Sequence, residues 1–212
     1  MTKKEEWLAG TRSAVPIMLG YVPVGIAYGV MARQAGLNTW QTVLMSLTVY
    51  GGASEMMAAG MVAQGAAVLT IVLTTFILNL RHIIMSTCVF NQMQGGRLPV
   101  RMLAAFGVTD ETFAVYTTTA NAPRTPRYFF SMALCSYLSW ALGSWLGAIA
   151  TGLLPPLITA ALGISLYAMF IGLLMPGLHG NGRLAALVVL TALCNTVLCN
   201  VVQLDSGWSM IL

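Results

Sequence analysis

A few ionisable residues interrupt the long apolar stretches of this 212-residue sequence. They are Glu55, Arg81, Asp110 and Glu111, and each lies well inside an apolar stretch. An ionised side chain in hydrocarbon costs at least ~2.5 kcal/mol, so such residues usually face a pathway or a partner. Their positions predict a protein that spans the bilayer and has a polar interior.

Helix geometry predicts which of these groups can meet. At ~1.5 Å per residue and with a core ~30 Å thick, Arg81 falls within ~5 Å of the depth of Asp110 and Glu111. We therefore expect Arg81 to pair with one of these carboxylates, either as a structural contact or as part of a functional site. Glu55 lies ~12 Å from the level of Arg81 on the same count, so a direct pair between those two is doubtful.

Proton transfer is one chemistry that these residue types allow. Glu55 could carry a proton, or it could be a neutral group hydrogen-bonded to a neighbouring helix. The same two interpretations hold for His82, because an imidazole exchanges protons near neutral pH. The candidates for proton coupling or gating are Glu55, Asn79, Arg81, His82, Asp110 and Glu111.

Two helix breaks are predicted beside these charges, near 20–25 and near 107–111. Pro23 removes a backbone donor, and Gly20 and Gly25 let backbones approach closely. A broken helix would offer free N–H groups to an anion. A harmless proline kink with glycines for helix packing is the competing interpretation.

The second predicted break contains two adjacent carboxylates, Asp110 and Glu111. Thr109 or Asp110 could cap the half-helix that follows. Capping needs only one side chain, however, so the presence of two adjacent carboxylates favours a functional role.

Composition places the chain in a membrane. Charged residues make up 8% of the sequence, against ~25% in soluble domains, and hydrophobic residues reach 58%. The net charge of +4 is interpreted as a topology signal from loop Lys and Arg rather than as nucleic-acid binding. The four cysteines lie in apolar stretches without metal-site spacing, and nucleotide-binding and metalloprotease motifs are missing. We expect no metal, no cofactor and no enzymatic activity.

Apolar stretches of about 20 residues predict an all-α polytopic protein with about seven transmembrane helices, in one domain over 1–212. The predicted spans are 14–32, 42–62, 66–90, 102–120, 129–152, 155–176 and 184–203. An N-terminus in the cytoplasm puts six loop Lys and Arg inside and three outside. Arg97 and Arg101 argue against this orientation, and a re-entrant fourth segment would be one way to resolve the conflict.

A weak internal repeat predicts how the spans are related. A shift of 87 residues aligns nine identical residues over 46 positions, among them Gly20 with Gly107. The repeat units would be 14–90 and 102–176, with 184–203 as an extra helix. Three spans in each unit would invert the second copy, which is typical of secondary transporters that bind substrate near the midplane at broken helices.

Four motifs, in order and spacing, resemble the AzlC (YgaZ-like) permeases over about 14–203. They are the glycine-rich segment 20–29, Tyr50-Gly51-Gly52-Ala53-Ser54-Glu55, Asn79-Leu80-Arg81-His82, and Thr109-Asp110-Glu111-Thr112-Phe113-Ala114. The resemblance implies the large subunit of a bacterial inner-membrane exporter of branched-chain amino acids. It also implies a small AzlD-like (YgaH-like) membrane partner. The family usually has Gln where this chain has Glu55.

A transporter would need sites for the carboxylate, the ammonium and the side chain of an amino acid. We expect the N–H groups near 20–23 to bind the carboxylate, Asp110 or Glu111 the ammonium, and apolar walls the side chain. The candidate substrate-binding residues are Gly20, Tyr21, Pro23, Gly25, Tyr50, Asp110, Glu111 and Phe113. We expect coupling to protons through Glu55, Asp110 or Glu111.

Two alternatives stay open. One is a membrane subunit or sensor that transports nothing, with the polar residues holding a partner. The other is an intramembrane serine protease with Ser54 as nucleophile and His82 as base, although their expected depths of ~11–12 Å and ~24 Å disagree.

Overall fold

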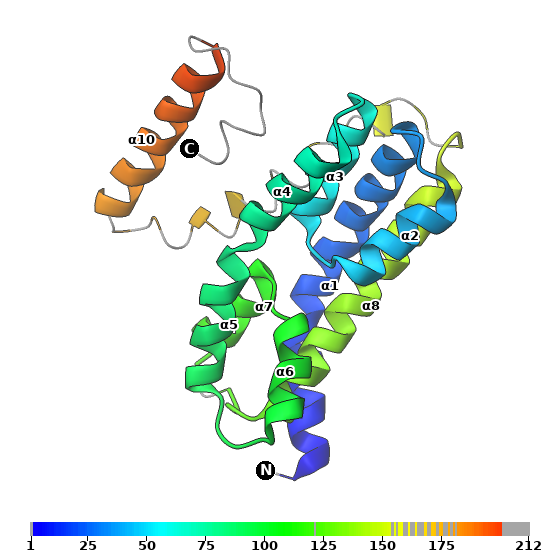
Figure 1. Ribbon diagram of the computed structural model, residues 1–212. Coiled ribbons are helices and arrows are strands. Elements are labelled where there is room, and N and C mark those ends of the chain that lie inside the picture. Colours follow the sequence, from blue (N-terminus) through cyan, green and yellow to red (C-terminus); the bar gives the residue numbers. More distant parts are fainter. Residues whose placement is uncertain are drawn as a thin grey trace.

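The fold is known from a computed structural model that describes residues 2–120, 122–153 and 182–200, and scattered positions from 155 to 180. Every element among the described residues is a helix (Figure 1). The predicted span 155–176 lies largely outside the described residues. The helices are α1 (Lys3–Gln34), α2 (Thr39–Thr48), α3 (Gly52–Ala63), α4 (Val68–Asn79), α5 (Arg81–Gln92), α6 (Leu98–Phe106), α7 (Asp110–Thr118), α8 (Pro126–Ala150) and α10 (Gly182–Asn200).

Within the described residues, three helical segments are long and apolar enough to cross a membrane. They are α1, the nearly continuous pair α4–α5 over Val68–Gln92, and α8. α10 is a shorter apolar helix that corresponds to the predicted span 184–203. In Figure 1 it stands apart from the other helices, and its described apolar side chains are largely exposed.

α1 and α8 pack side by side in parallel and form the centre of the molecule (Figure 1). Near their N-terminal ends, Gly10 lies against Ser131, and further along both helices Gly29 lies against Ala148. Glycines let the two backbones touch, as in many membrane helix pairs. Trp140 and Phe129 of α8 are buried in this central layer.

α2 and α3 form a hairpin, here called hairpin A (Thr39–Ala63), that enters and leaves at the same end of the bundle. α2 begins beside the C-terminal half of α1, where the Tyr28 hydroxyl donates to the Thr42 carbonyl at 3.2 Å. The chain turns at Tyr50, and α3 then runs back to the level at which α2 began. α4 leaves from that level and ends with Asn79 against Gly51, at the tip of the hairpin.

α6 and α7 form the opposite hairpin, hairpin B (Leu98–Thr118), which enters from the end that holds the N-terminus (Figure 1). The segments that flank it meet at that end, because the Gln94 N–H donates to the Arg124 carbonyl at 2.6 Å. Phe106, at the end of α6, reaches the middle of α8, with its ring 5.7 Å from that of Tyr137. The two hairpins therefore approach each other from opposite ends and meet tip to tip.

The seven-span prediction is not confirmed, because segments 42–62 and 102–120 each turn back. Each half of a hairpin has 9 to 12 residues, or roughly 14–18 Å of helix, which is about half of a ~30 Å core. The predicted break near 107–111 is confirmed, since α6 ends at Phe106 and α7 begins at Asp110.

The predicted break near 20–25 is wrong, because α1 runs without interruption through Pro16 and Pro23. A proline inside a helix removes one backbone hydrogen bond and strains the preceding turn. Close contact between Gly25 and the α8 backbone holds this part of α1 in place. The other break lies between α2 and α3 instead.

Candidate functional site

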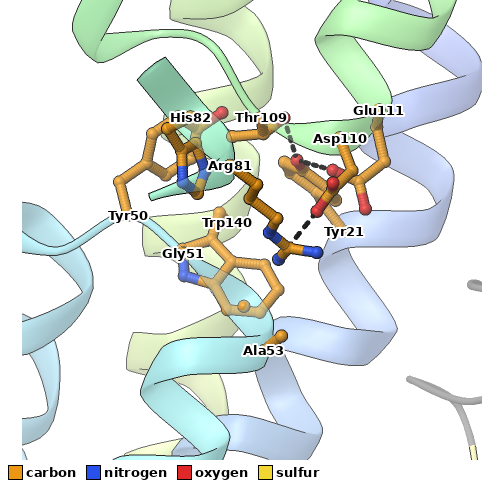
Figure 2. Close-up of a pocket in the computed structure, with 11 residues that line it drawn as sticks. Tyr21, Tyr50, Gly51, Ala53, Arg81, His82, Thr109, Asp110, Glu111 and Trp140 are labelled. Carbon is orange, nitrogen blue, oxygen red and sulfur yellow. Dashed lines mark hydrogen bonds and ion pairs between the residues drawn. The ribbon is translucent and has the colours of Figure 1, made fainter. Parts of the chain in front are cut away.

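A pocket lies where the hairpin tips meet, between α1, α8 and the α4–α5 junction (Figure 2). With its open mouth included it holds about 350 Å³ of empty space, and its enclosed part has room for roughly one water molecule. Four of its residues carry an ionisable acid, guanidinium or imidazole group within an apolar chain. The lining residues are Tyr21, Tyr50, Gly51, Gly52, Ala53, Arg81, His82, Thr109, Asp110, Glu111 and Trp140.

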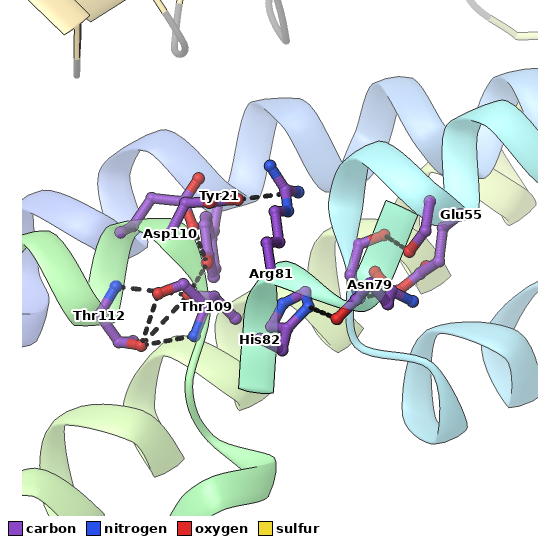
Figure 3. Close-up of polar contacts among 11 residues, drawn as sticks. Tyr21, Glu55, Asn79, Arg81, His82, Thr109, Asp110 and Thr112 are labelled. Atoms are coloured by element: carbon purple, nitrogen blue, oxygen red, sulfur yellow. Dashed lines mark hydrogen bonds and ion pairs between the residues drawn. The ribbon is translucent and has the colours of Figure 1, made fainter. Parts of the chain in front are cut away.

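Hairpin B is capped and tied to α1 at its tip. Thr109 and Thr112 satisfy each other's backbone N–H groups and so fix the start of α7 (Figure 3). The buried Tyr21 hydroxyl of α1 donates to Glu111 Oε2 at 2.5 Å and lies 2.7 Å from Thr109 Oγ1 (Figure 2). Tyr21 thus connects the central helix pair to both the cap and a carboxylate of hairpin B.

The predicted ion pair between Arg81 and a carboxylate is confirmed, and the carboxylate is Asp110. Arg81 Nη2 lies 2.9 Å from Asp110 Oδ2, and the two side chains are 35% and 26% exposed. They reach the pocket from different elements, since Arg81 begins α5 and Asp110 begins α7. Arg81 Nε is buried without a hydrogen-bond partner. The ion pair therefore faces the pocket, and the Arg81 Nε–H group could still donate a hydrogen bond to a ligand.

Glu55 lies behind the pocket, inside the tip of hairpin A, and is fully buried. Its Oε1 accepts from the Gly51 N–H at 2.9 Å, and its Oε2 lies 3.0 Å from the Ser46 hydroxyl. The Trp140 indole N–H lies 3.3 Å from both oxygens. As expected from depth, Glu55 does not pair with Arg81. The carboxyl group joins α2, the turn and α8, which is a positioning role.

Aromatic rings form one wall of the pocket. The Tyr21 and Trp140 rings lie 5.4 Å apart, and the Tyr50 ring lies 4.9 Å from that of Tyr137. Tyr50 itself has a φ of 46°, a left-handed conformation that costs about 1–3 kcal/mol for a residue other than glycine. Its hydroxyl is buried without a hydrogen-bond partner. Strain and an unpaired hydroxyl at one turn indicate a functional position.

Of the sequence-predicted residues, six line the pocket: Tyr21, Tyr50, Arg81, His82, Asp110 and Glu111. The others lie elsewhere: Gly20, Pro23 and Gly25 inside α1, Phe113 against the core, Asn79 beside the tip of hairpin A, and Glu55 buried within that tip. Sequence reasoning missed Trp140, which looks like any other apolar span residue. The adjacent glycines Gly51 and Gly52 were the signal that could have predicted the break between α2 and α3.

The residues of the protease alternative do not form a catalytic pair. The Ser54 hydroxyl donates to the Gly51 carbonyl at 2.8 Å, and His82 Nδ1 lies 3.2 Å from the Asn79 carbonyl (Figure 3). A nucleophile and its base must share a hydrogen bond. This arrangement does not favour hydrolysis.

Comparison of the sequence with known proteins places this chain among membrane proteins. The family model described as AzlC protein matches residues 16–154. An uncharacterised membrane protein of Archaeoglobus fulgidus is 33% identical over 88% of this chain and 82% of its own length. Inner membrane protein YgaZ of Escherichia coli is 30% identical over 80% of this chain and 72% of its own length. Branched-chain amino acid transport protein AzlC of Bacillus subtilis is 27% identical over 70% of this chain and 61% of its own length. No solved structure matches the chain.

Proposed function

We propose, starting from the fact that this chain belongs to the AzlC family of membrane proteins, that it is a secondary transporter subunit exporting branched-chain amino acids. One observation carries the proposal: two hairpins from opposite ends meet tip to tip at a pocket that holds charged groups. Helices that end within the membrane, with their tips at a midplane cavity, are typical of secondary transporters. The name of the Bacillus subtilis relative supplies the substrate class.

The pocket offers one type of group for each part of an amino acid. We assign the substrate carboxylate to the start of α3, where the first N–H groups, at Gly52 and Ala53, have no partner within the helix. This site replaces the one expected at 20–23. Asp110 and Glu111 would bind the ammonium, and the aromatic wall would contact the aliphatic side chain.

The hairpins supply a basis for alternating access. α1 with hairpin A, and α4–α5 with hairpin B, are each a through-helix followed by a hairpin, and they run in opposite directions (Figure 1). The helix ends Gln34 and Gln92 are 58 residues apart, as are the tip residues Tyr50 and Val108. We propose that these two units form the inverted repeat, in place of 14–90 and 102–176. Each hairpin would then open the pocket toward its own side of the membrane.

The hairpins also remove the conflict in the topology signal. Because hairpin A returns to its starting end and α4–α5 then crosses back, Arg97 and Arg101 lie at the same end as the N-terminus, and Arg33 lies at the other. The basic residues of the described chain at the N-terminal end are Lys3, Lys4, Arg12, Arg97, Arg101, Arg124 and Arg127. The positive-inside rule then supports an N-terminus in the cytoplasm of the bacterial inner membrane.

Proton coupling and a partner complete the proposal. Asp110 and Glu111 are the acidic groups that line the pocket, so they are better placed to carry a proton with the substrate than Glu55.

The small AzlD-like membrane subunit would pack against α4–α5. Much less of this span is buried than of α1 or α8, and Phe76 and Ile84 are among its exposed residues.

The test is leucine and valine efflux from cells that express the chain with its small partner. We expect Asp110→Asn and Glu111→Gln to reduce efflux at least tenfold, while Glu5→Gln, at the exposed start of α1, leaves it unchanged. Efflux equal to wild type in both pocket variants would refute the assigned site. Absence of efflux from a folded, correctly inserted wild-type complex would favour a sensor or a subunit that transports nothing.

A further inference from the structure

We propose that the Arg81–Asp110 ion pair occupies the place of the substrate's own two charges, and that a zwitterionic amino acid enters by replacing it. The substrate carboxylate, assigned above to the start of α3, pairs with Arg81 as well, since both line the same pocket, and the ammonium pairs with Asp110. The inference rests on the proposed function, which it deepens: the ion pair restricts the substrates to molecules that carry both charges.

The geometry of the pocket favours such an exchange. Arg81 Nη2 and Asp110 Oδ2 are 2.9 Å apart across the pocket, and its enclosed space holds little more than a water molecule. The enclosed part has no room for a leucine molecule beside an intact pair. The charged groups of leucine must separate the guanidinium from the carboxylate, and its carbon skeleton then lies against the rings of Tyr21 and Trp140.

The chemistry of the pair explains why both substrate charges are needed. Separating two partly buried charges without replacing either partner is strongly unfavourable, since each needs a counter-charge in a medium of low polarity. A zwitterion supplies a carboxylate to the cation and an ammonium to the anion, so that both charges stay paired. An amine or a carboxylic acid alone would leave one of them uncompensated, and is therefore rejected.

Unused donors around the pair point to the carboxylate side of the exchange. Arg81 Nε and the Tyr50 hydroxyl are both buried without hydrogen-bond partners, and both residues line the pocket. A carboxylate has two oxygens and can accept several hydrogen bonds, some of them from a guanidinium. A bound carboxylate would give these two donors hydrogen-bond partners.

The exchange also links occupancy to movement of hairpin B. Arg81 belongs to the through-span α4–α5, whereas Asp110 belongs to the tip of hairpin B, so their bond ties the two elements together. The tie through Tyr21 and Glu111 connects the same tip to α1. Substrate that splits the ion pair removes one of these two ties.

The experiment uses the purified chain, with its small partner, in liposomes and measures uptake of three probes. They are leucine, 3-methylbutylamine, which lacks the carboxylate, and 4-methylpentanoate, which lacks the ammonium. We expect the wild type to carry leucine and to reject both single-charge probes by more than tenfold. Arg81→Gln should lose leucine and accept the amine, and Asp110→Asn should lose leucine and accept the acid.

Two further variants keep the result interpretable. Arg127→Gln changes an exposed arginine at the start of α8 and should behave as wild type. The double variant Arg81→Asp with Asp110→Arg restores a pair of reversed polarity and should recover leucine uptake relative to either single variant. Leucine should also raise the unfolding temperature of the wild type but not of the single variants.

The two proposals fail in different ways. A wild type that neither binds nor carries leucine overturns the proposed function and the exchange with it. A wild type that carries leucine, with single variants that fold and show no switch toward the single-charge probes, overturns the exchange alone. Lack of recovery in the folded double variant overturns it as well.

Discussion

The contact between Tyr21 and hairpin B gives the sharpest test of the site, because the chain contains a matched control. Tyr21→Phe removes one hydroxyl that donates to Glu111 Oε2 at 2.5 Å and lies 2.7 Å from Thr109 Oγ1. Tyr116→Phe makes the same change at a tyrosine that is also fully buried, but whose hydroxyl has no hydrogen-bond partner. The control keeps the ring that faces the Arg124 guanidinium at 4.8 Å.

A hydrogen bond to a charged group contributes about 1.5–3 kcal/mol. Each kcal/mol moves the unfolding temperature by about 2–4 °C in a chain of this size, so Tyr21→Phe should lower it by about 3–12 °C. Tyr116→Phe loses no bond and should stay within about 2 °C of wild type. Leucine efflux should fall in Tyr21→Phe, since the tip of hairpin B is no longer held to α1, and should persist in Tyr116→Phe.

The assay is thermal unfolding of the detergent-purified variants, followed by efflux at a temperature at which both remain folded. Equal shifts in the two variants would show that Tyr21 acts by ring packing alone. A larger loss in Tyr116→Phe would refute the role given to the Tyr21 hydroxyl. Normal efflux in a folded Tyr21→Phe variant would show that transport does not need the hydrogen bond between Tyr21 and hairpin B.

Three further predictions test the fold and the hairpin tips. Gly147→Ala forces a methyl group into the α1 backbone and should destabilise the protein by about 1–3 kcal/mol, whereas Gly60→Ala enters open space and should be neutral in thermal unfolding. Glu55→Gln keeps an acceptor for the hairpin turn and should retain efflux, whereas Glu55→Leu leaves buried donors unpaired and should abolish it. Gln64→Cys should react with an impermeant thiol reagent only from outside whole cells and Gln94→Cys only from inside, and seven full spans require the reverse.

The partners of Arg81 could be predicted from the sequence because depth in a bilayer is a linear count along a helix. Arg81 and Asp110 lie near the middle of their segments from either end, so the count gives the right level even though hairpin B turns back. Contact still required the fold, because two residues at one level can lie on opposite sides of a bundle.

Whether a segment crosses the membrane or turns back within it could not be predicted in the same way. Hairpin A is 25 residues long from Thr39 to Ala63, which is the length of a crossing helix, and hydropathy sums over residues without regard to a turn among them. Gly51 and Gly52 mark the turn, but paired glycines also occur within packed helices. The conflict over Arg97 and Arg101 was the better signal, since it indicated a segment that does not cross.

Pro23 shows why the local rule failed in α1. A proline lowers the stability of a helix in isolation, but membrane helices tolerate it where neighbours hold the backbone. Gly25 and Gly29 bring α1 against α8 on both sides of the next turn. That support comes from residues more than a hundred positions away, which no local pattern contains.

Tip-to-tip hairpins also bring four helix ends together in one layer of the protein. α2 and α6 end there with their carbonyl ends, and α3 and α7 begin there with their amide ends. Each carbonyl end carries about half a negative charge and each amide end about half a positive one, so the four macrodipoles sum to nearly zero. The layer therefore places main-chain acceptors and main-chain donors close together, and would offer both kinds of group to a molecule of mixed polarity.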